Sequence, residues 1–166
     1  MNSTNLENDA SIRSVALFDN EEVGSQSAYG ADSNLLLVAL KRVCESFQNK
    51  DSAKDEAELA MLKSFLISAD MAHACHPNYM EKHEENHRPV MSGGLVIKEN
   101  ANQRYATTSA TTLLLREVGK IKSIPLQEFC VRNDSPCGST IGPMLSSKLG
   151  LRTVGMFCEV GIRLLT

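Results

Sequence analysis

Apolar residues gather in short runs that polar segments separate. The runs are rich in β-branched, aliphatic and aromatic side chains, and several end at a carboxylate or a glycine. Short apolar runs bounded by turn residues are typical of buried strands. They predict strands at 12–18, 64–70, 95–100, 126–134 and 152–162.

Other segments carry apolar residues at helical spacing. One helix is predicted from near Ser33 to Phe47, where the apolar residues fall on one face. A second is predicted over 109–121, with Ser109 or a neighbour as its cap, and a third over 140–150, closed by Gly150. Residues 49–60 have mixed charge and predict an exposed connection or the start of a polar helix.

Strands that alternate with helices predict an α/β fold, in which helices cover both faces of a sheet. Ligands bind such sheets beyond the carboxyl ends of the strands. Acidic residues follow several predicted strands, so we expect them to converge on one rim. They are Asp19, Glu21, Glu22, Asp70 and Asp134.

Composition narrows the function classes. The 166 residues carry a net charge of −3 and lack a long basic patch, so no nucleic-acid partner is expected. No apolar run approaches the length of a membrane span, and the polar leader at 1–10 lacks the apolar core of a signal peptide. The five cysteines have no CxxC spacing, which favours free thiols and a cytoplasmic location.

The stretch "VALFDNEEVGS" (15–25) places three carboxylates at the end of an apolar run. Crowded like charges cost free energy unless a cation offsets them. Zn²⁺, Mn²⁺ and Co²⁺ accept carboxylate ligands, and a second carboxylate can take a proton from an attacking water. A solvated acidic turn explains the same residues, and local sequence does not separate the two interpretations. Asp70, after "FLISA", has the same two explanations.

All four histidines lie between His73 and His87. The segment "HEENH" (83–87) matches the H-E-x-x-H pattern of zinc peptidases, in which two histidines one helical turn apart hold the metal. That pattern needs a packed helix and a third ligand downstream, whereas this segment is polar and no histidine follows it. A zincin built on "HEENH" therefore stays an alternative. Cys137 has no base at a suitable spacing and is interpreted as a structural thiol.

Four blocks together resemble the aspartyl aminopeptidases, a family of dinuclear zinc exopeptidases. They are "LFDNEEVGS", "SFLISADMAHACHPNYMEKHEENHRPV", "VIKENANQRYAT" and "VRNDSPCGSTIGPMLSSKLGLR". The resemblance runs from about Asn5 to Arg152 and covers the distal half of the family's catalytic domain. It implies a three-layer α/β/α fold with a mixed, mostly parallel sheet. Residues 11–166 would form part of that domain, without the family's dimerisation domain.

The resemblance implies roles residue by residue. Glu21 matches the general base, Glu22 a ligand of one zinc ion, and Asp70 a ligand of the other. His73, Lys98 and Tyr105 match residues that hold the substrate. The implied reaction removes an N-terminal Asp or Glu from a peptide, and a cationic Lys98 suits an acidic side chain. Mn²⁺ or Co²⁺ are alternatives to Zn²⁺ at such a site. The family forms homo-oligomers.

Some of the family pattern has no counterpart in these 166 residues. A metal-binding His and a bridging Asp precede the "FDNEEVGS" block in the family, and a zinc-binding His follows "LGLR". Of the family's zinc ligands, only Glu22 and Asp70 have counterparts, so the ligand set is incomplete. We therefore expect weak zinc binding, little activity of the isolated chain and unpaired sheet edges. A non-catalytic chain that assembles with intact subunits is the other interpretation.

Overall fold

The computed structural model describes residues 9, 11–48, 55–139 and 141–160. Its secondary structure alternates between strands and helices as the sequence predicts. In chain order the elements are η2 (Glu21–Val23), α1 (Leu35–Phe47), α2 (Glu56–Leu62), β1 (Phe65–His73), η3 (Pro77–Lys82), β2 (Leu95–Glu99), α3 (Ser109–Lys122), β3 (Leu126–Cys130), α4 (Ile141–Leu149) and β4 (Arg152–Val160).

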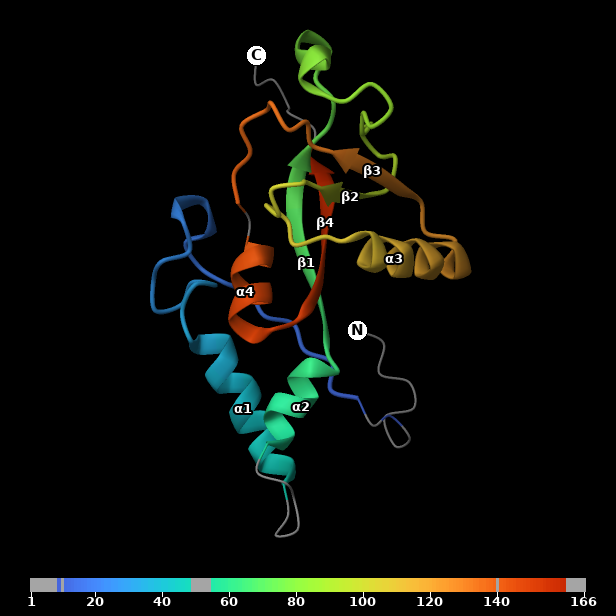
Figure 1. Ribbon diagram of the computed structural model, residues 1–166. Helices are drawn as coiled ribbons and strands as arrows, with labels where there is room; N and C mark the ends of the chain where they lie inside the picture. Colours follow the sequence, from blue (N-terminus) through green and yellow to red (C-terminus); the bar gives the residue numbers. More distant parts are fainter. Residues whose placement is uncertain (1–8, 10, 49–54, 140, 161–166) are drawn as a thin grey trace.

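The four described strands form one sheet in the order β1-β4-β2-β3 (Figure 1). β1 pairs with β4 in parallel and β2 pairs with β3 in parallel, while β2 and β4 are antiparallel. The sheet is therefore mixed, and most of its pairings are parallel. This confirms the predicted fold class.

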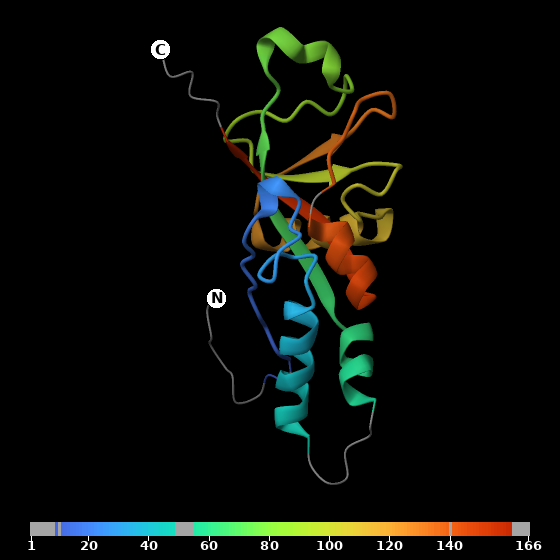
Figure 2. The ribbon, with the colours of Figure 1, turned by 90° about the vertical axis from the view of Figure 1, so that its left-hand side faces the viewer.

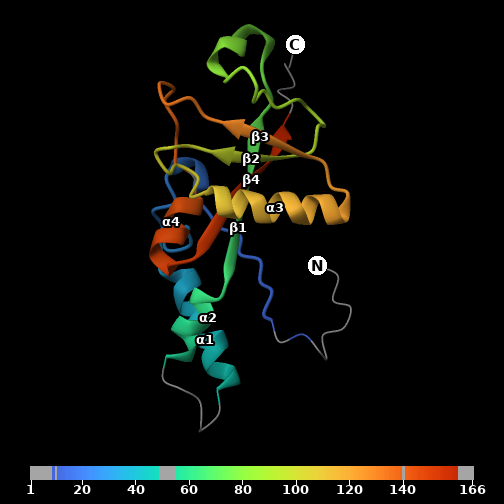
Figure 3. The ribbon, with the colours of Figure 1, turned by 45° about the vertical axis from the view of Figure 1, so that its right-hand side comes forward.

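Helices α3 and α4 pack on opposite faces of the sheet. A Cβ on Gly142 of α4 would meet Ser68, which pairs with Gly155 of β4. A Cβ on Gly119 of α3 would meet Leu126. Leu126 lies on the same face of the sheet as Ile97 and the strand partner of Ile97, Met156. Neighbouring residues of a strand point to opposite faces, so Gly155 and Met156 separate the two helices. Figure 3 shows α3 lying across the strands and α4 beside β1.

Two groups of buried apolar side chains hold the layers together. One lies on the α4 side of the sheet and comprises Ala72, Val96, Tyr105, Phe129, Val131 and Phe157. The other joins α4 to α1 and the segment before it, through Ala31, Leu145, Leu149 and Leu151. Phe18 and the inward-facing leucines of α1 pack against this second group. Burying such side chains gives the main favourable term in folding.

The predicted strand at 12–18 is wrong. These residues join no sheet, and Val15 and Leu17 are 72% and 90% exposed. A strand needs a hydrogen-bonded partner, and among the described residues none pairs with this segment. Two predicted boundaries also move. β1 continues to His73, so Asp70 lies inside the strand, and β3 ends at Cys130 rather than at residue 134.

Some apolar surface stays exposed on the α3 side. Leu113, Leu114 and Ile121 of α3 are exposed, and so are Ile67 and Met71 of β1. Within the described residues, β1 pairs only with β4, which leaves its other edge unpaired, as expected. No helix in the described part of the chain is long and apolar enough to cross a membrane.

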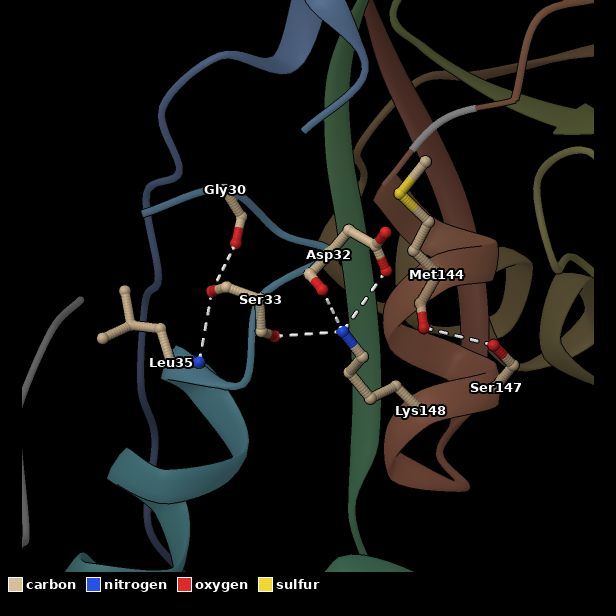
Figure 4. Close-up of polar contacts among 7 residues, drawn as sticks. All are labelled: Gly30, Asp32, Ser33, Leu35, Met144, Ser147 and Lys148. Carbon is tan, nitrogen blue, oxygen red and sulfur yellow. Dashed lines mark hydrogen bonds and ion pairs between the residues drawn. The ribbon is translucent and has the colours of Figure 1, made fainter. Parts of the chain in front are cut away.

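Lys148 joins the segment before α1 to α4, which packs on the sheet (Figure 4). Its ammonium donates to the carbonyl oxygens of Asp32 and Ser33 and lies 3.3 Å from the Asp32 carboxylate. Ser33 in turn accepts a hydrogen bond from the Leu35 amide at 3.2 Å, at the start of α1. One side chain therefore fixes the segment that follows the acidic turn.

Replacing Lys148 with methionine should lower the free energy of unfolding by about 1 kcal/mol, because two carbonyl groups lose a charged donor. Urea unfolding followed by circular dichroism measures the change. Lys120→Met is the matched control, since Lys120 forms an exposed ion pair with Glu117 on α3. Equal losses in both variants would contradict this role of Lys148.

Candidate active site

The acidic turn is built by two residues with left-handed backbone. Asn20 has φ 61° and precedes the single turn of η2, and Gly24 has φ 103° and follows it. Asparagine and glycine adopt this conformation at low cost. The Ser25 amide donates to the Asn20 carbonyl at 2.8 Å and closes the turn. Glu21 is half-buried in this turn and Glu22 is exposed.

Glu21 lies in the electrostatic field of Asp70 on β1. Partial burial raises the pKa of Glu21, and the charges of Asp70 and Glu22 raise it further. η2 lies on the side of the sheet that faces the viewer in Figure 2. The structure thus brings three of the predicted carboxylates together. Asp134 does not join them: its carboxylate is held by Arg132 at 2.6 Å, which lowers its pKa.

The raised pKa of Glu21 predicts a pH-dependent effect on stability. The folded chain binds this proton more tightly than the unfolded chain, so ionised Glu21 destabilises the fold. Glu21→Gln should therefore stabilise the isolated chain at pH 7, and the gain should fade as pH falls toward about 4, below which Glu21 is protonated in both states. Urea midpoints at several pH values measure this. Glu45→Gln, which removes an exposed carboxylate of α1, is the comparison for a change of charge.

Lys98 and Tyr105 are both buried beside these carboxylates. The Lys98 ammonium lies over the ring of Phe157, 4.1 Å from its centroid, and 5.3 Å from that of Tyr105. Phe157 pairs with Asp70 across β1 and β4, which places the ring and the carboxylate on the same face. Burial raises the pKa of Tyr105, as do its hydrogen bond to Cys137 and the charge of Asp70. Lys98 is therefore a buried cation rather than a surface lysine.

His73 lies at the end of β1, next to an aromatic group. Its ring centroid is 6.4 Å from that of Phe129 and 5.7 Å from that of His83. Phe129 pairs with Lys98 across β2 and β3, and its ring centroid is 5.7 Å from the Lys98 ammonium. Ring contacts therefore link His73 through Phe129 to Lys98, and Lys98 to Tyr105. Asp70 shares a face with this group through its partner Phe157, and the charges of Asp70 and Glu22 act on Glu21.

The "HEENH" segment is not helical, so its histidines do not stand one helical turn apart. His83 is buried and stacks on Phe129 at 5.1 Å between centroids. Glu84 accepts a hydrogen bond from His87 at 2.5 Å, which lowers the pKa of Glu84. These contacts give the segment a packing role and remove the geometry that a zincin needs.

Sequence reasoning did not assign Phe129, Phe157 or Cys137 to the site. The two phenylalanines belong to strands that were predicted correctly, but their neighbours depend on which strands pair. Two shallow hollows of about 320 and 400 Å³ lie around Ile124 and Pro125, away from all six predicted residues. Neither hollow is lined by a predicted site residue.

The match to a family model decides which family the chain belongs to. The description of that model is aminopeptidase I zinc metalloprotease (M18), and it matches residues 1–161. This chain is an M18 zinc metalloprotease family member. The resemblance to aspartyl aminopeptidases is confirmed as well. A probable aspartyl aminopeptidase of Ricinus communis is 59% identical over 151 residues, and the aspartyl aminopeptidase of Caenorhabditis elegans is 56% identical over 153.

Solved M18 structures share the fold. The Ape4 chain of an Ape4 and Nbr1 complex matches with a TM-score of 0.78 and 51% identity, over 84% of this chain and 26% of that one. A Saccharomyces cerevisiae mApe1 dodecamer matches with a TM-score of 0.74 and 31% identity, over 86% of this chain and 30% of that one. The chain covers 30% of the Ricinus relative and 32% of the Caenorhabditis relative, while 91% and 92% of its own length match.

The M18 family implies zinc, and the described residues fit part of a zinc site. Burial raises the pKa of Glu21, and the charges of Asp70 and Glu22 add to the shift; a cation would offset this repulsion. However, no group of three or more His, Cys, Asp and Glu side chains in the described ranges could hold a metal ion. Zinc takes about four ligands. Glu22 and Asp70 could thus supply some of the zinc ligands, and they do not form a complete site by themselves.

Proposed function

We propose that residues 11–166 form part of the catalytic domain of an aminopeptidase that removes N-terminal Asp or Glu from peptides. The observation that carries this proposal is the group of carboxylates, buried ammonium and phenol on one side of the sheet. A buried Lys98 beside Asp70, within an aromatic group, suits recognition of an acidic side chain. The identity of 59% and 56% to aspartyl aminopeptidases supports the same substrate class.

Each proposed role follows from position. Glu21, with its raised pKa, takes a proton from the attacking water and passes it to the departing amine. Lys98 pairs with the acidic side chain of the substrate, and Tyr105 and His73 hold the substrate beside it. Glu22 would hold one zinc ion and Asp70 the other, with Mn²⁺ or Co²⁺ as alternatives, and the metal would polarise the scissile carbonyl.

The ligand set of this chain is incomplete, so the proposal includes a requirement for other ligands. We propose that the complete site forms only when further metal ligands accompany these residues, in a cytoplasmic homo-oligomer. The mApe1 relative is solved as a dodecamer. The exposed apolar residues of α3 and the unpaired edge of β1 are consistent with further contacts on that side.

A chimera tests the proposal. The purified chain should release no aspartate from an Asp-peptide and hold less than one zinc ion by elemental analysis. A chimera in which this chain replaces the matching segment of the Ricinus communis enzyme should release aspartate, and a chelator should stop it. His87→Asn in the chimera should leave its zinc content unchanged, because His87 is bound to Glu84 rather than to a metal.

The outcomes separate the alternatives. A folded chimera that binds zinc but has no activity would favour a non-catalytic chain that assembles with intact subunits. Chelator-sensitive activity of the isolated chain would contradict the proposed requirement for other ligands. Loss of zinc in the His87→Asn chimera would return the metal to the "HEENH" segment.

A further inference from the structure

Cys137 contacts the phenol of Tyr105, and the proposed function assigns it no role. The two side chains come from different loops, one after β2 and one between β3 and α4. The Cys137 sulfur lies 2.8 Å from the Tyr105 oxygen and 3.4 Å from the carbonyl oxygen of Gly138. Because a carbonyl only accepts, the thiol hydrogen points to Gly138. The phenol is then the donor to sulfur.

The rest of Tyr105 is fixed by packing. Its ring meets Phe157 edge to face, with centroids 5.4 Å apart, and the side chain is 6% exposed. Its backbone carbonyl lies against two glycines, since a Cβ on Gly142 or Gly155 would come within 3.3 Å of that oxygen. Packing thus leaves one free choice, namely the direction of the phenol hydrogen about the C–O bond.

We propose that Cys137 is a positioning residue that takes the phenol hydrogen of Tyr105, so that the phenol oxygen meets the substrate as an acceptor. A phenol with its hydrogen committed to sulfur presents lone pairs. Lone pairs suit the N–H groups at the N-terminus of a peptide, and the acidic side chain is left to Lys98. The inference rests on the proposed function only for the role of Tyr105. The contact between the two residues stands apart from that function.

The contact is tested first in the isolated chain by phenol ionisation. The chain has three tyrosines and no tryptophan, so Tyr29→Phe with Tyr79→Phe leaves Tyr105 as the single ultraviolet reporter. In this background Cys137→Ala should lower the pH at which the phenolate absorbance begins to rise, because the hydrogen bond favours the neutral phenol. Cys137→Ser should restore the later onset. Circular dichroism limits the comparison to the pH range in which each chain is folded.

If the phenolate absorbance begins to rise at the same pH in the Cys137, Cys137→Ser and Cys137→Ala chains, the inference is overturned. This holds independently of the activity of the chimera. Cys158→Ala removes an exposed thiol on β4 and should leave the onset unchanged. An alanine chain that does not fold leaves the comparison between cysteine and serine. In that comparison the phenolate absorbance should begin to rise late in both the Cys137 chain and the Cys137→Ser chain. An early onset in the Cys137→Ser chain would overturn the inference.

The second measurement uses the chimera. Cys137→Ala should raise KM for an Asp-peptide roughly fivefold with kcat nearly unchanged, the size expected for losing one hydrogen-bonded orientation. Cys137→Ser should recover most of the KM. If Cys137→Ala lowers only kcat, or only the fraction of chimera that is folded, the residue has a structural role, and the proposed positioning role is overturned. An inactive parent chimera would count against the proposed function, and the phenol measurement would then decide the inference alone.

Discussion

Glu21→Gln in the chimera should lower kcat for an Asp-peptide by about 1,000-fold, within the range that general-base catalysis contributes. Glutamine keeps the shape and the polar contacts of Glu21 but takes no proton. The neighbouring acids explain why this carboxyl is suited to the role. Burial raises its pKa, the charges of Asp70 and Glu22 raise it further, and a carboxylate with a raised pKa is a stronger base for the attacking water.

Zinc content distinguishes loss of the base from loss of the metal. The Glu21→Gln chimera should keep the zinc content of its parent, because the proposal gives the metal to Glu22 and Asp70. Glu22→Gln should instead lower zinc content and activity together. Glu45→Gln, on the exposed side of α1, controls for a change of charge alone. A Glu21→Gln chimera with more than a tenth of the parent rate would contradict the assignment of the base.

Lys98→Met should abolish the preference of the chimera for substrates with an acidic N-terminal residue. We expect kcat/KM for an Asp-peptide to fall roughly 100-fold, because a buried charge-assisted bond is lost. The rate for an Ala-peptide should change little. Methionine has a similar length and is apolar, so it can pack between Phe129 and Phe157 where the lysine chain lies.

The decisive measurement is the ratio of kcat/KM for the Asp-peptide to kcat/KM for the Ala-peptide. Lys120→Met removes an exposed lysine of α3 and should leave the ratio unchanged. Equal losses for the Asp-peptide and the Ala-peptide would indicate a structural lysine, and the specificity role would then be wrong. An unchanged ratio with full activity would place the acidic side chain of the substrate elsewhere.

Helical periodicity was a reliable guide to local structure. α1 and α3 begin and end close to the predicted limits, because an apolar face buried by packing leaves a clear pattern. The cap of α3 is Thr108, the neighbour of Ser109, as the prediction allowed, and its hydroxyl accepts from the Thr111 amide. The apolar run at 12–18 failed as a strand because its sequence says nothing about whether a partner strand is present.

Local pattern and tertiary contacts contribute differently to the candidate site. The motifs pointed to Glu21, Glu22, Asp70, His73, Lys98 and Tyr105, and their roles stay predictions. The motifs did not reveal that Lys98 is buried among rings, since Phe129 and Phe157 belong to other strands. Nor did they reveal that His83 stacks on Phe129, or that Arg132 pairs with Asp134.

Sequence was enough to predict the family, the helices α1, α3 and α4, the four strands of the sheet, and the residues that carry the proposed chemistry. Each of these depends on residue type and on short spacing along the chain. Which residues meet depends on the tertiary fold. The parallel pairing of β1 with β4 places Phe157 beside Asp70, and the pairing of β2 with β3 places Phe129 beside Lys98. Such contacts join residues far apart in the chain, so their distances follow from strand register rather than from local pattern.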